Sequence, residues 1–557
     1  MRKKISKILT IVLAASLLLT ACNSEAKSDA ESEISLSRTY KFPDLDIDKY
    51  EYYDYKEHAQ AFDDLVFVKG KASSPELIWT DKTYDTFGIA AYVGDYRHGK
   101  DGDEEAITTM AAVLSASLIG IDKANEHENN YVDQLNSYFS ESEKVVLNNL
   151  NSRSREISFW YQIYPCLLFA KISILYPEQN ILRKNCLQML ESWYEAYEVL
   201  YPNSEEANFN HTGFDFEKMQ AYDNEIWTEP DSAVGIAHLM DMAYELSGEV
   251  KYLKAAKNCL EYIESYFGGP LYELLEYYSP YLSSKYNLLY DTNIDIEREF
   301  GRVFDGASNV RGGWGVINDT WSDYDVSGLF GSRTDRNGYA FAMNTFAGLD
   351  ALIPSVKYNH KYANSIGELI LRTTNNAKYF FSEFSEPENQ SLKNAEINID
   401  PEISNLVPYE GIINTYGGKT PWFGGYPLIN DWALSDFSLY SGAHIGIFSH
   451  RISETNIDAV LKVDINEISN KEQFPSYLIY NPYNKSIKVE YLNNSDEEIK
   501  LYECISNKLI CEELGQNETL NLEIEANSSL IITELSKDAE ISQKDNLIEA
   551  DDIYLSY

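Results

Sequence analysis

Carboxylates stand beside a tryptophan in the most polar stretch of the sequence, which begins at Asn210. Asp223 and Glu225 precede Trp227 there. Cleavage of a glycosidic bond uses two carboxyl groups, one that protonates the leaving oxygen and one that activates water or attacks the sugar. Asp223 and Glu225 are therefore candidate catalytic acids, and Trp227 is a candidate platform for a sugar ring. Asp231, which follows Pro230, is better explained as part of a helix cap begun by Thr228.

A second polar stretch, residues 309–339, is a long loop, and long loops in compact domains are usually functional. Glycines flank Trp314, so a ring can approach the backbone closely. Arg333 and Arg336 form a clamp suited to a carboxylate or sulfate. Asp335, between them, is either an acid or base or the cap of a helix that begins near residue 337. We expect Glu225, Asp335 and Trp314 to share one cleft.

His444 follows a third stretch rich in glycine and aromatic residues, 417–443. A neutral histidine suits a lyase base, with Tyr339 or Tyr440 as proton donor. The plainer interpretation is a histidine packed beneath the C-terminal domain. Both interpretations of His444 stay open, and Tyr339 and His444 are candidate substrate-binding residues.

Oxygen ligands at calcium-like spacing occur between Gly94 and Glu105. The stretch lacks the complete EF-hand pattern. It is a Ca²⁺ loop, a rim loop or an acidic helix start favoured by the helix dipole, and the last is the simplest. We predict no cofactor and no other metal site.

The elements that must position these residues are mostly helices between residues 40 and 455. Apolar residues recur there with the helical period, and short connections, as at Gly248, make antiparallel hairpins. No repeat of 30–45 residues is evident, which argues against a regular solenoid and favours a closed toroid. The predicted helices span 104–121, 132–150, 157–176, 180–200, 231–246, 252–267, 339–352 and 358–381.

The period changes to two near Ala459, and seven short strands between residues 456 and 537 predict a small antiparallel β-sandwich. Residues 538–557 are acidic and are predicted to be a loose tail. If Asn507 and Lys508 form a turn, Cys504 and Cys511 oppose each other across a hairpin, within disulfide range.

The N-terminus resembles a bacterial lipoprotein signal. Residues 1–21 combine a basic start with a short apolar run, and Leu19-Thr20-Ala21 precedes Cys22. We predict cleavage before Cys22, lipid on its sulfur, and a flexible tether over residues 22–39. The protein would then lie outside the cytoplasm, anchored to a membrane.

The formal charge of −42 falls to about −46 after loss of residues 1–21. Such a surface repels nucleic acid and anionic lipid head groups, so neither is an expected partner.

The helical hairpins, the Trp- and Gly-rich loops and the C-terminal sandwich together resemble the six-hairpin (α/α)6 carbohydrate-active enzymes. The stretch Ala233–Ala256 is typical of their helix pairs. The resemblance implies a carbohydrate substrate and, because acids outnumber basic candidates in the loops, a glycoside hydrolase. Two alternatives stay open, a polysaccharide lyase acting on uronic acids and a glycan-binding lipoprotein without catalysis.

Overall fold

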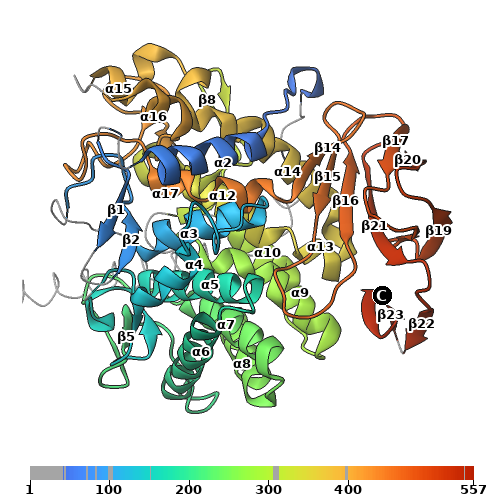
Figure 1. Ribbon diagram of the computed structural model, residues 1–557, viewed down its shortest axis with the longest axis horizontal. Helices are drawn as coiled ribbons and strands as arrows, with labels where there is room; N and C mark the ends of the chain where they lie inside the picture. Colours follow the sequence, from blue (N-terminus) through green and yellow to red (C-terminus); the bar gives the residue numbers. More distant parts are fainter. Residues whose placement is uncertain are drawn as a thin grey trace, which may run out of the picture.

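The computed structural model describes most of the chain after the N-terminal segment. The described residues are 42, 46–70, 73, 75–81, 85–97, 105–150, 152–304, 313–394, 399–544 and 546–557. Within them, no helix is long and apolar enough to cross a membrane. A helical body carries antiparallel sheets at its C-terminal side (Figure 1). The predicted signal peptide, Cys22 and the whole predicted tether lie outside the described residues.

One set of helices is buried on nearly all sides, because their sequences are almost wholly apolar or small. In α3 every residue from Ala106 to Ala116 is buried. These helices contact one another in a closed circuit. The α3 helix contacts α5, α5 contacts α7, α7 contacts η5, η5 contacts α12, α12 contacts α18, and α18 contacts α3. These inner helices are α3 (Ala106–Leu118), α5 (Phe159–Leu175), α7 (Ser232–Ser247), η5 (Leu275–Tyr278) with α9 (Ser279–Leu289), α12 (Ala342–Leu352), α17 (Leu439–Gly442) and α18 (Ile445–Ser449).

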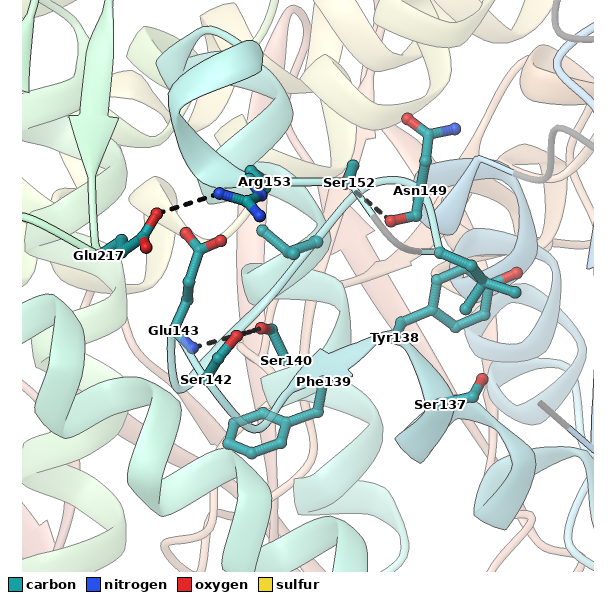
Figure 2. A pocket seen from close by; sticks show the side chains of 12 residues that line it. Ser137, Tyr138, Phe139, Ser140, Ser142, Glu143, Asn149, Ser152, Arg153 and Glu217 are labelled. Atoms are coloured by element: carbon teal, nitrogen blue, oxygen red, sulfur yellow. Dashed lines mark hydrogen bonds and ion pairs between the residues drawn. The ribbon is translucent and has the colours of Figure 1, made fainter. Parts of the chain in front are cut away.

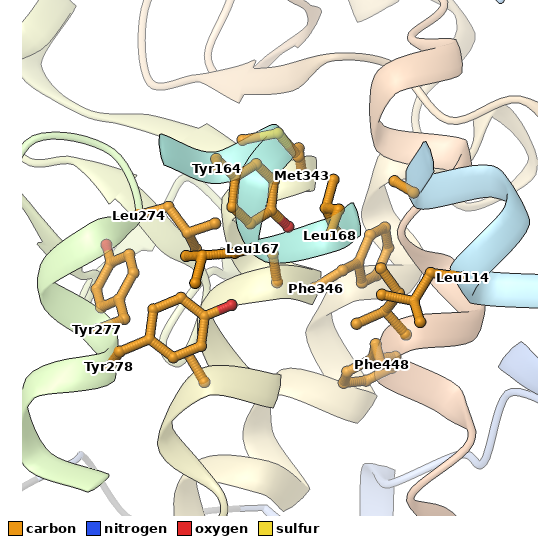
Figure 3. Packing of buried hydrophobic residues seen from close by; sticks show 14 of the residues in the cluster. Leu114, Tyr164, Leu167, Leu168, Leu274, Tyr277, Tyr278, Met343, Phe346 and Phe448 are labelled. Carbon is orange, nitrogen blue, oxygen red and sulfur yellow. The ribbon is translucent and has the colours of Figure 1, made fainter. Parts of the chain in front are cut away.

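A second set of helices is amphipathic and covers the first. The α6 and α8 helices bury one face against α7, and α14 packs on α12. Figure 3 shows the core that the inner helices share, where Leu167 and Leu168 lie beside Tyr278 and Phe346. The outer helices are α2 (Tyr55–Asp63), α6 (Asn180–Leu200), α8 (Val250–Ser265), α10 (Ile296–Phe304) and α14 (Ala363–Asn376).

A five-stranded antiparallel sheet that the sequence did not predict lies within the helical body. Residues 339–341, expected to begin a helix, form its central strand. Its order is β13-β12-β11-β10-β7, with β7 (Trp314–Val316), β10 (Phe330–Ser332), β11 (Tyr339–Phe341), β12 (Gly411–Ile413) and β13 (Trp422–Gly424).

The helix predicted over residues 132–150 is wrong. Only Tyr131–Gln134 (α4) and the 3₁₀ turn that follows are helical, and the β3–β4 hairpin (Phe139–Ser140 and Val145–Val146) replaces the rest. Lys144 has a left-handed φ of 56°, which closes the hairpin turn and cannot continue a helix. Other short hairpins are β1–β2 (Ile78–Asp81, Thr86–Ile89), β5–β6 (Gly213–Asp215, Gln220–Tyr222) and β8–β9 (Thr320–Trp321, Tyr324–Asp325).

The C-terminal strands agree with the predicted sandwich. A six-stranded sheet of order β14-β15-β16-β21-β18-β19 faces the β17–β20 pair, and side chains from both sheets share one core. In β17 buried and exposed residues alternate strictly. The strands are β14 (Ile452–Glu454), β15 (Leu461–Asp464), β16 (Ser476–Asn481), β17 (Ile487–Leu492), β18 (Ile499–Glu503), β19 (Lys508–Leu514), β20 (Thr519–Ile524) and β21 (Ser528–Ser536).

Two predictions for this end of the chain are corrected. The last residues are not a loose tail, since β22 (Ile541–Lys544), β23 (Leu547–Ala550) and β24 (Ile553–Ser556) form a sheet. Tyr554 of that sheet stacks on Tyr358 of the helical body. Cys504 and Cys511 are free thiols, because the turn begins at Cys504 and the register places Leu501, not Cys504, opposite Cys511.

Candidate active site at the N-termini of the inner helices

Acids and tyrosines from distant parts of the sequence stand where the inner helices begin. Glu105 occupies the N-cap position of α3, and Tyr161 lies in the first turn of α5. Glu273 lies two residues before η5, and Tyr440 lies within α17. Because these helices run in the same contact circuit, their N-termini bring together residues more than three hundred positions apart.

Two of these glutamates act on the same pair of hydroxyls. Burial and the charges of Glu105 and Glu273 raise the pKa of Tyr161 above its ordinary value. The pKa of Tyr440 is raised by burial and by the same two charges. Both tyrosines therefore stay protonated at neutral pH and can donate hydrogen bonds. Glu273 and Tyr161 are partly exposed, so solvent reaches this group.

Glu105 is held by an arginine that packs against two aromatic rings. Arg97 contacts the Glu105 carboxylate at 3.2 Å and that of Asp95 at 2.7 Å. Its guanidinium carbon lies 5.2 Å from the ring centre of Tyr92 and 5.5 Å from that of Trp432. Trp432 is partly exposed, so an aromatic ring that solvent reaches stands next to the ion pair of Arg97 and Glu105.

Glu273 adopts a strained backbone conformation, with a left-handed φ of 57°. Its carbonyl accepts a hydrogen bond of 2.9 Å from Asn344 Nδ2, and the neighbouring Tyr272 amide donates to Asp231 Oδ2 at 3.1 Å. A non-glycine residue keeps this conformation only when its surroundings enforce it, and such residues gather at functional sites. Asp231 thus holds this loop, and it occupies the N-cap position of α7 rather than the third helical position that the sequence suggested.

Glu229 has a structural role in this group. Its side chain is fully buried, and Oε2 accepts a 2.7 Å hydrogen bond from the Trp160 amide. The carboxylate therefore satisfies a free amide in the first turn of α5 and fixes the turn that carries Tyr161.

Glu410, just before β12, is a third carboxyl in this region. Its oxygens accept hydrogen bonds from the Tyr92 hydroxyl at 2.7 Å and the Tyr426 amide at 2.6 Å, and the Tyr339 hydroxyl also bonds to it. Burial raises the pKa of Glu410 to about 7. Its donors are all neutral, so the carboxyl gains and loses a proton near neutrality.

Several residues singled out from the sequence gather around the five-stranded sheet. Trp314 packs edge-on against Tyr339, with 6.2 Å between ring centres, and Tyr339 packs against Tyr426 at 4.9 Å. The Tyr426 hydroxyl donates to Asp335 Oδ2 at 2.5 Å, and the Arg336 guanidinium lies 5.2 Å from the Tyr426 ring. Trp314, Tyr339, Asp335 and Arg336 thus form one connected group.

Asp335 and Arg336 are exposed, and Asp335 opens a three-residue 3₁₀ turn rather than capping a helix. Arg333 is partly exposed, and its amide bonds to the Gly313 carbonyl at 3.1 Å.

The other predicted acids lie on the loop after β6. Asp223 is exposed and bonds to His211 Nδ1 at 3.1 Å, and Trp227 is half-buried. Glu225 is exposed with φ 60°, and its carboxylate makes no hydrogen bond or ion pair with the part of the chain that is described. No described contact joins Glu225 to Trp314 or Asp335, so their shared cleft stays a prediction.

His444 belongs to the core, which corrects its assignment as a substrate-binding residue. The ring is fully buried. Its Nδ1 bonds to the Tyr440 carbonyl at 2.7 Å, so that nitrogen carries the proton and Nε2 accepts from the Tyr164 hydroxyl at 2.8 Å. Burial lowers the pKa of His444 to about 4. Its apolar surroundings, not catalysis, explain this residue.

Residues 98–104 of the predicted calcium loop lie outside the described residues. Among the described residues, no group of three or more acidic, histidine or cysteine side chains is arranged to hold a metal ion.

Sequence reasoning missed Glu273 and Glu410, and it placed Glu105 only at a helix start. Glu273 and Glu410 have no recognisable motif beside them, and Glu105 is the last of three consecutive acids, Asp103 to Glu105. For Glu105 and Glu273 one usable signal was position, because an acid that precedes an apolar inner helix must lie at the end where those helices begin.

No protein-family model and no curated protein matches the chain. Solved structures with a distant likeness include a GH127 β-L-arabinofuranosidase from Geobacillus stearothermophilus T6, with 8% identity over 91% of this chain and 85% of that one and a TM-score of 0.38. A family 76 glycoside hydrolase from a bovine Bacteroides thetaiotaomicron strain shares 11% identity over 72% and 77% of the two chains, with a TM-score of 0.40. An endoglucanase from the termite Nasutitermes takasagoensis shares 10% identity over 72% and 99%, with a TM-score of 0.39. At these values the likeness does not assign an activity or a substrate to this chain.

Proposed function

We propose that this chain is a glycoside hydrolase that uses Glu105 and Glu273 as its pair of carboxyl groups. The observation that carries the proposal is their place: both acids stand where inner helices begin, Glu105 at the N-cap of α3 and Glu273 just before η5, and the charges of both raise the pKa values of Tyr161 and Tyr440. Two carboxyl groups flanking one bond are what glycoside hydrolysis requires, and roughly 5–10 Å between them suits one of its two stereochemical outcomes. The closed contact circuit of inner helices supports an (α/α)6 toroid as the frame.

The surroundings favour hydrolysis over elimination. A lyase needs a base that removes a proton next to a carboxylate. Tyr161 and Tyr440 hold their protons firmly, since their pKa values are raised, and His444 is buried with both ring nitrogens bonded. Arg97, which stands in this site, is already engaged by Asp95 and Glu105. The glutamates are therefore the better candidates for proton transfer.

The test is product analysis on a panel of neutral and uronic oligosaccharides. We expect the wild-type chain to release shortened sugars without an unsaturated product. Glu105→Gln and Glu273→Gln should each lower turnover by about 10²–10⁴. The melting temperature should change little in Glu273→Gln, which is partly exposed, and should fall in Glu105→Gln, which loses its ion pair with Arg97. The matched control is Glu195→Gln, an exposed glutamate on α6, which should keep full activity.

Three results would contradict the proposal: an unsaturated, ultraviolet-absorbing product; glycan binding without turnover; or full activity in both glutamate variants.

We further propose that the protein is exported and anchored through lipid on Cys22, outside the cytoplasm. The basic start, short apolar run and small residues before Cys22 support this. Metabolic labelling with a fatty acid should mark the wild-type chain and not Cys22→Ala. Label retained by Cys22→Ala would reject the anchor.

A further inference from the structure

A polar pocket of about 430 Å³ opens beside the β3–β4 hairpin. The hairpin forms one wall, the segment that follows it forms another, and Glu217 closes a third side (Figure 2). Its volume lies in the range of small-ligand sites. None of the residues assigned to the candidate active site lines it. Its walls include Ser142, Glu143, Leu147, Asn149, Arg153 and Glu217.

The rim of the pocket offers one cation, two carboxylates and other hydrogen-bonding groups. Arg153 contacts Glu217 at 3.3 Å, and both side chains are about half exposed, at 50% and 56%. Glu143 uses Oε2 to accept the Ser154 amide at 3.1 Å, and its side chain points toward Arg153 (Figure 2). Arginine and carboxylate groups side by side can bond to neighbouring hydroxyls of a neutral ligand.

The inner wall is apolar. Leu147 and Phe139 line the pocket and are otherwise buried, with 4% and 6% of their surfaces exposed. A pyranose ring has a hydroxyl-bearing edge and apolar faces, so a polar rim around an apolar wall matches both of its surfaces.

Hydrogen bonds join the residues beside the pocket to the helix starts that carry Glu105 and Tyr161. Asn149 follows Asn148, whose carbonyl accepts a 2.7 Å hydrogen bond from the Ala106 amide, the residue next to Glu105. Asn148 Oδ1 also accepts the Ile107 amide at 3.2 Å, so one residue caps α3 and borders the pocket. On the other side, the Ser154 carbonyl accepts Gln162 Nε2, one residue beyond Tyr161 on α5.

We propose that this pocket binds a neutral sugar unit of the same chain that the carboxyl pair cleaves. The substrate is then an oligo- or polysaccharide that extends from Glu105 past the start of α3, rather than a mono- or disaccharide. The inference deepens the proposed function and rests on it for the identity of the bond cleaved, but the pocket's affinity for sugar is measurable alone.

The test compares two arginines that share one partner. Arg155 lies 3.9 Å from the same Glu217 carboxylate and is 40% exposed, yet it does not line the pocket. Arg153→Ala and Arg155→Ala are made in the Glu273→Gln chain, so that little substrate is consumed during a titration. Each is titrated calorimetrically with cello-, manno-, xylo- and arabinohexaose. We expect at least one hexaose to bind the parent, and Arg153→Ala to weaken that binding about tenfold or more. Arg155→Ala should stay within about twofold.

Equal affinity of the two arginine variants would overturn the inference, and so would the absence of binding by all four hexaoses. A second variant, Ser142→Trp, fills the exposed mouth of the pocket and should weaken binding as Arg153→Ala does. If the wild-type chain cleaves no glycan but Arg153→Ala still loses hexaose affinity, the pocket stands and the hydrolase proposal fails. If the wild-type chain cleaves a glycan but Arg153→Ala keeps the parent affinity for hexaose, the hydrolase proposal stands and the pocket inference fails.

Discussion

Two glutamates in different parts of the molecule have pKa values shifted in opposite directions. Glu410, beside the five-stranded sheet, is 3% exposed and accepts hydrogen bonds from the neutral groups of Tyr92 and Tyr426. Glu467, where the sandwich meets the helical body, is 10% exposed and faces Lys357 at 3.4 Å and Lys285 at 3.8 Å. Burial raises the pKa of Glu410 to about 7.

For Glu467, burial acts in the same upward direction, but the charges of Lys357 and Lys285 outweigh it and hold its pKa at about 2. Charge matching, more than burial, therefore separates a structural ion pair from a carboxyl that exchanges protons near neutrality.

The largest effect should follow removal of a cation at the sandwich junction. Lys285 contacts Asp241 and Glu245 at 2.8 Å each. Lys285→Met leaves these acids buried without that cation, and we expect it to lower the free energy of unfolding by about 3–5 kcal/mol. Chemical denaturation measures this. Lys254→Met, at an exposed position on α8, is the control and should change stability by less than about 0.5 kcal/mol. Equal effects would mean that the junction is not held by its charges.

Stability should depend on pH in opposite ways at the two glutamates. The folded pKa of Glu467 is depressed, so its contribution is present above the unfolded pKa of about 4.3 and is lost as the pH falls toward 2. The folded pKa of Glu410 is raised, so its contribution is present below about pH 4.3 and is lost as the pH rises through 7. Each amounts to about 3 kcal/mol.

Denaturation curves of Glu467→Gln and Glu410→Gln across pH 2–8 test this contrast. In a plot of the free energy of unfolding against pH, Glu467→Gln should remove only the loss of stability below about pH 4. Glu410→Gln should remove only the loss of stability between about pH 4 and 7. If both variants change stability in the same pH range, the two glutamates do not lie in electrostatically different environments.

A smaller effect is expected from deleting one neutral donor. Tyr92→Phe removes a hydroxyl from Glu410 Oε1 and should cost about 1 kcal/mol, while moving the decline assigned to Glu410 to higher pH. Tyr96→Phe removes an exposed hydroxyl bonded to Asp431 at 2.5 Å and serves as the control. If the decline does not move in Tyr92→Phe, the tyrosine hydroxyl does not tune Glu410.

The smallest effects on stability are expected at exposed acids, which lie neither in a buried ion pair nor among buried neutral donors. Glu225 and Asp335 are exposed, so Glu225→Gln and Asp335→Asn should alter the free energy of unfolding by less than about 0.5 kcal/mol. Thermal melts at neutral pH measure this. A loss above 1 kcal/mol in Asp335→Asn would instead give its bond to Tyr426 a structural role.

The period of apolar residues along the sequence predicted the long helices and strands well. The helix expected over residues 180–200 is α6 with the same bounds, and the strand expected over residues 519–524 is β20. Both have a clear period that one buried face imposes. The segment 132–150 failed because its apolar residues fit a helix until the left-handed turn at Lys144. The short strands of the central sheet have only three residues each, too few to display a period.

The candidate site was predicted only in part, for a physical reason. Trp314, Tyr339 and Asp335 carry a local signal of aromatic and charged residues in a long loop, and the structure does connect them. Glu105 and Glu273 have meaning only once their helices lie side by side, since each alone is an ordinary acid before a helix. His444 misled because a rare residue type near glycine and tyrosine looks catalytic, whereas its surroundings are apolar.

The pH dependence of kcat/KM distinguishes a catalytic pair of carboxyl groups from two structural acids. On a glycan that the wild-type chain cleaves, we expect a bell-shaped profile set by one protonated and one ionised carboxyl group. Residual activity of Glu105→Gln should lack one limb of the bell, and that of Glu273→Gln should lack the other. A full bell retained by both variants would contradict the assignment of these two glutamates as the catalytic pair.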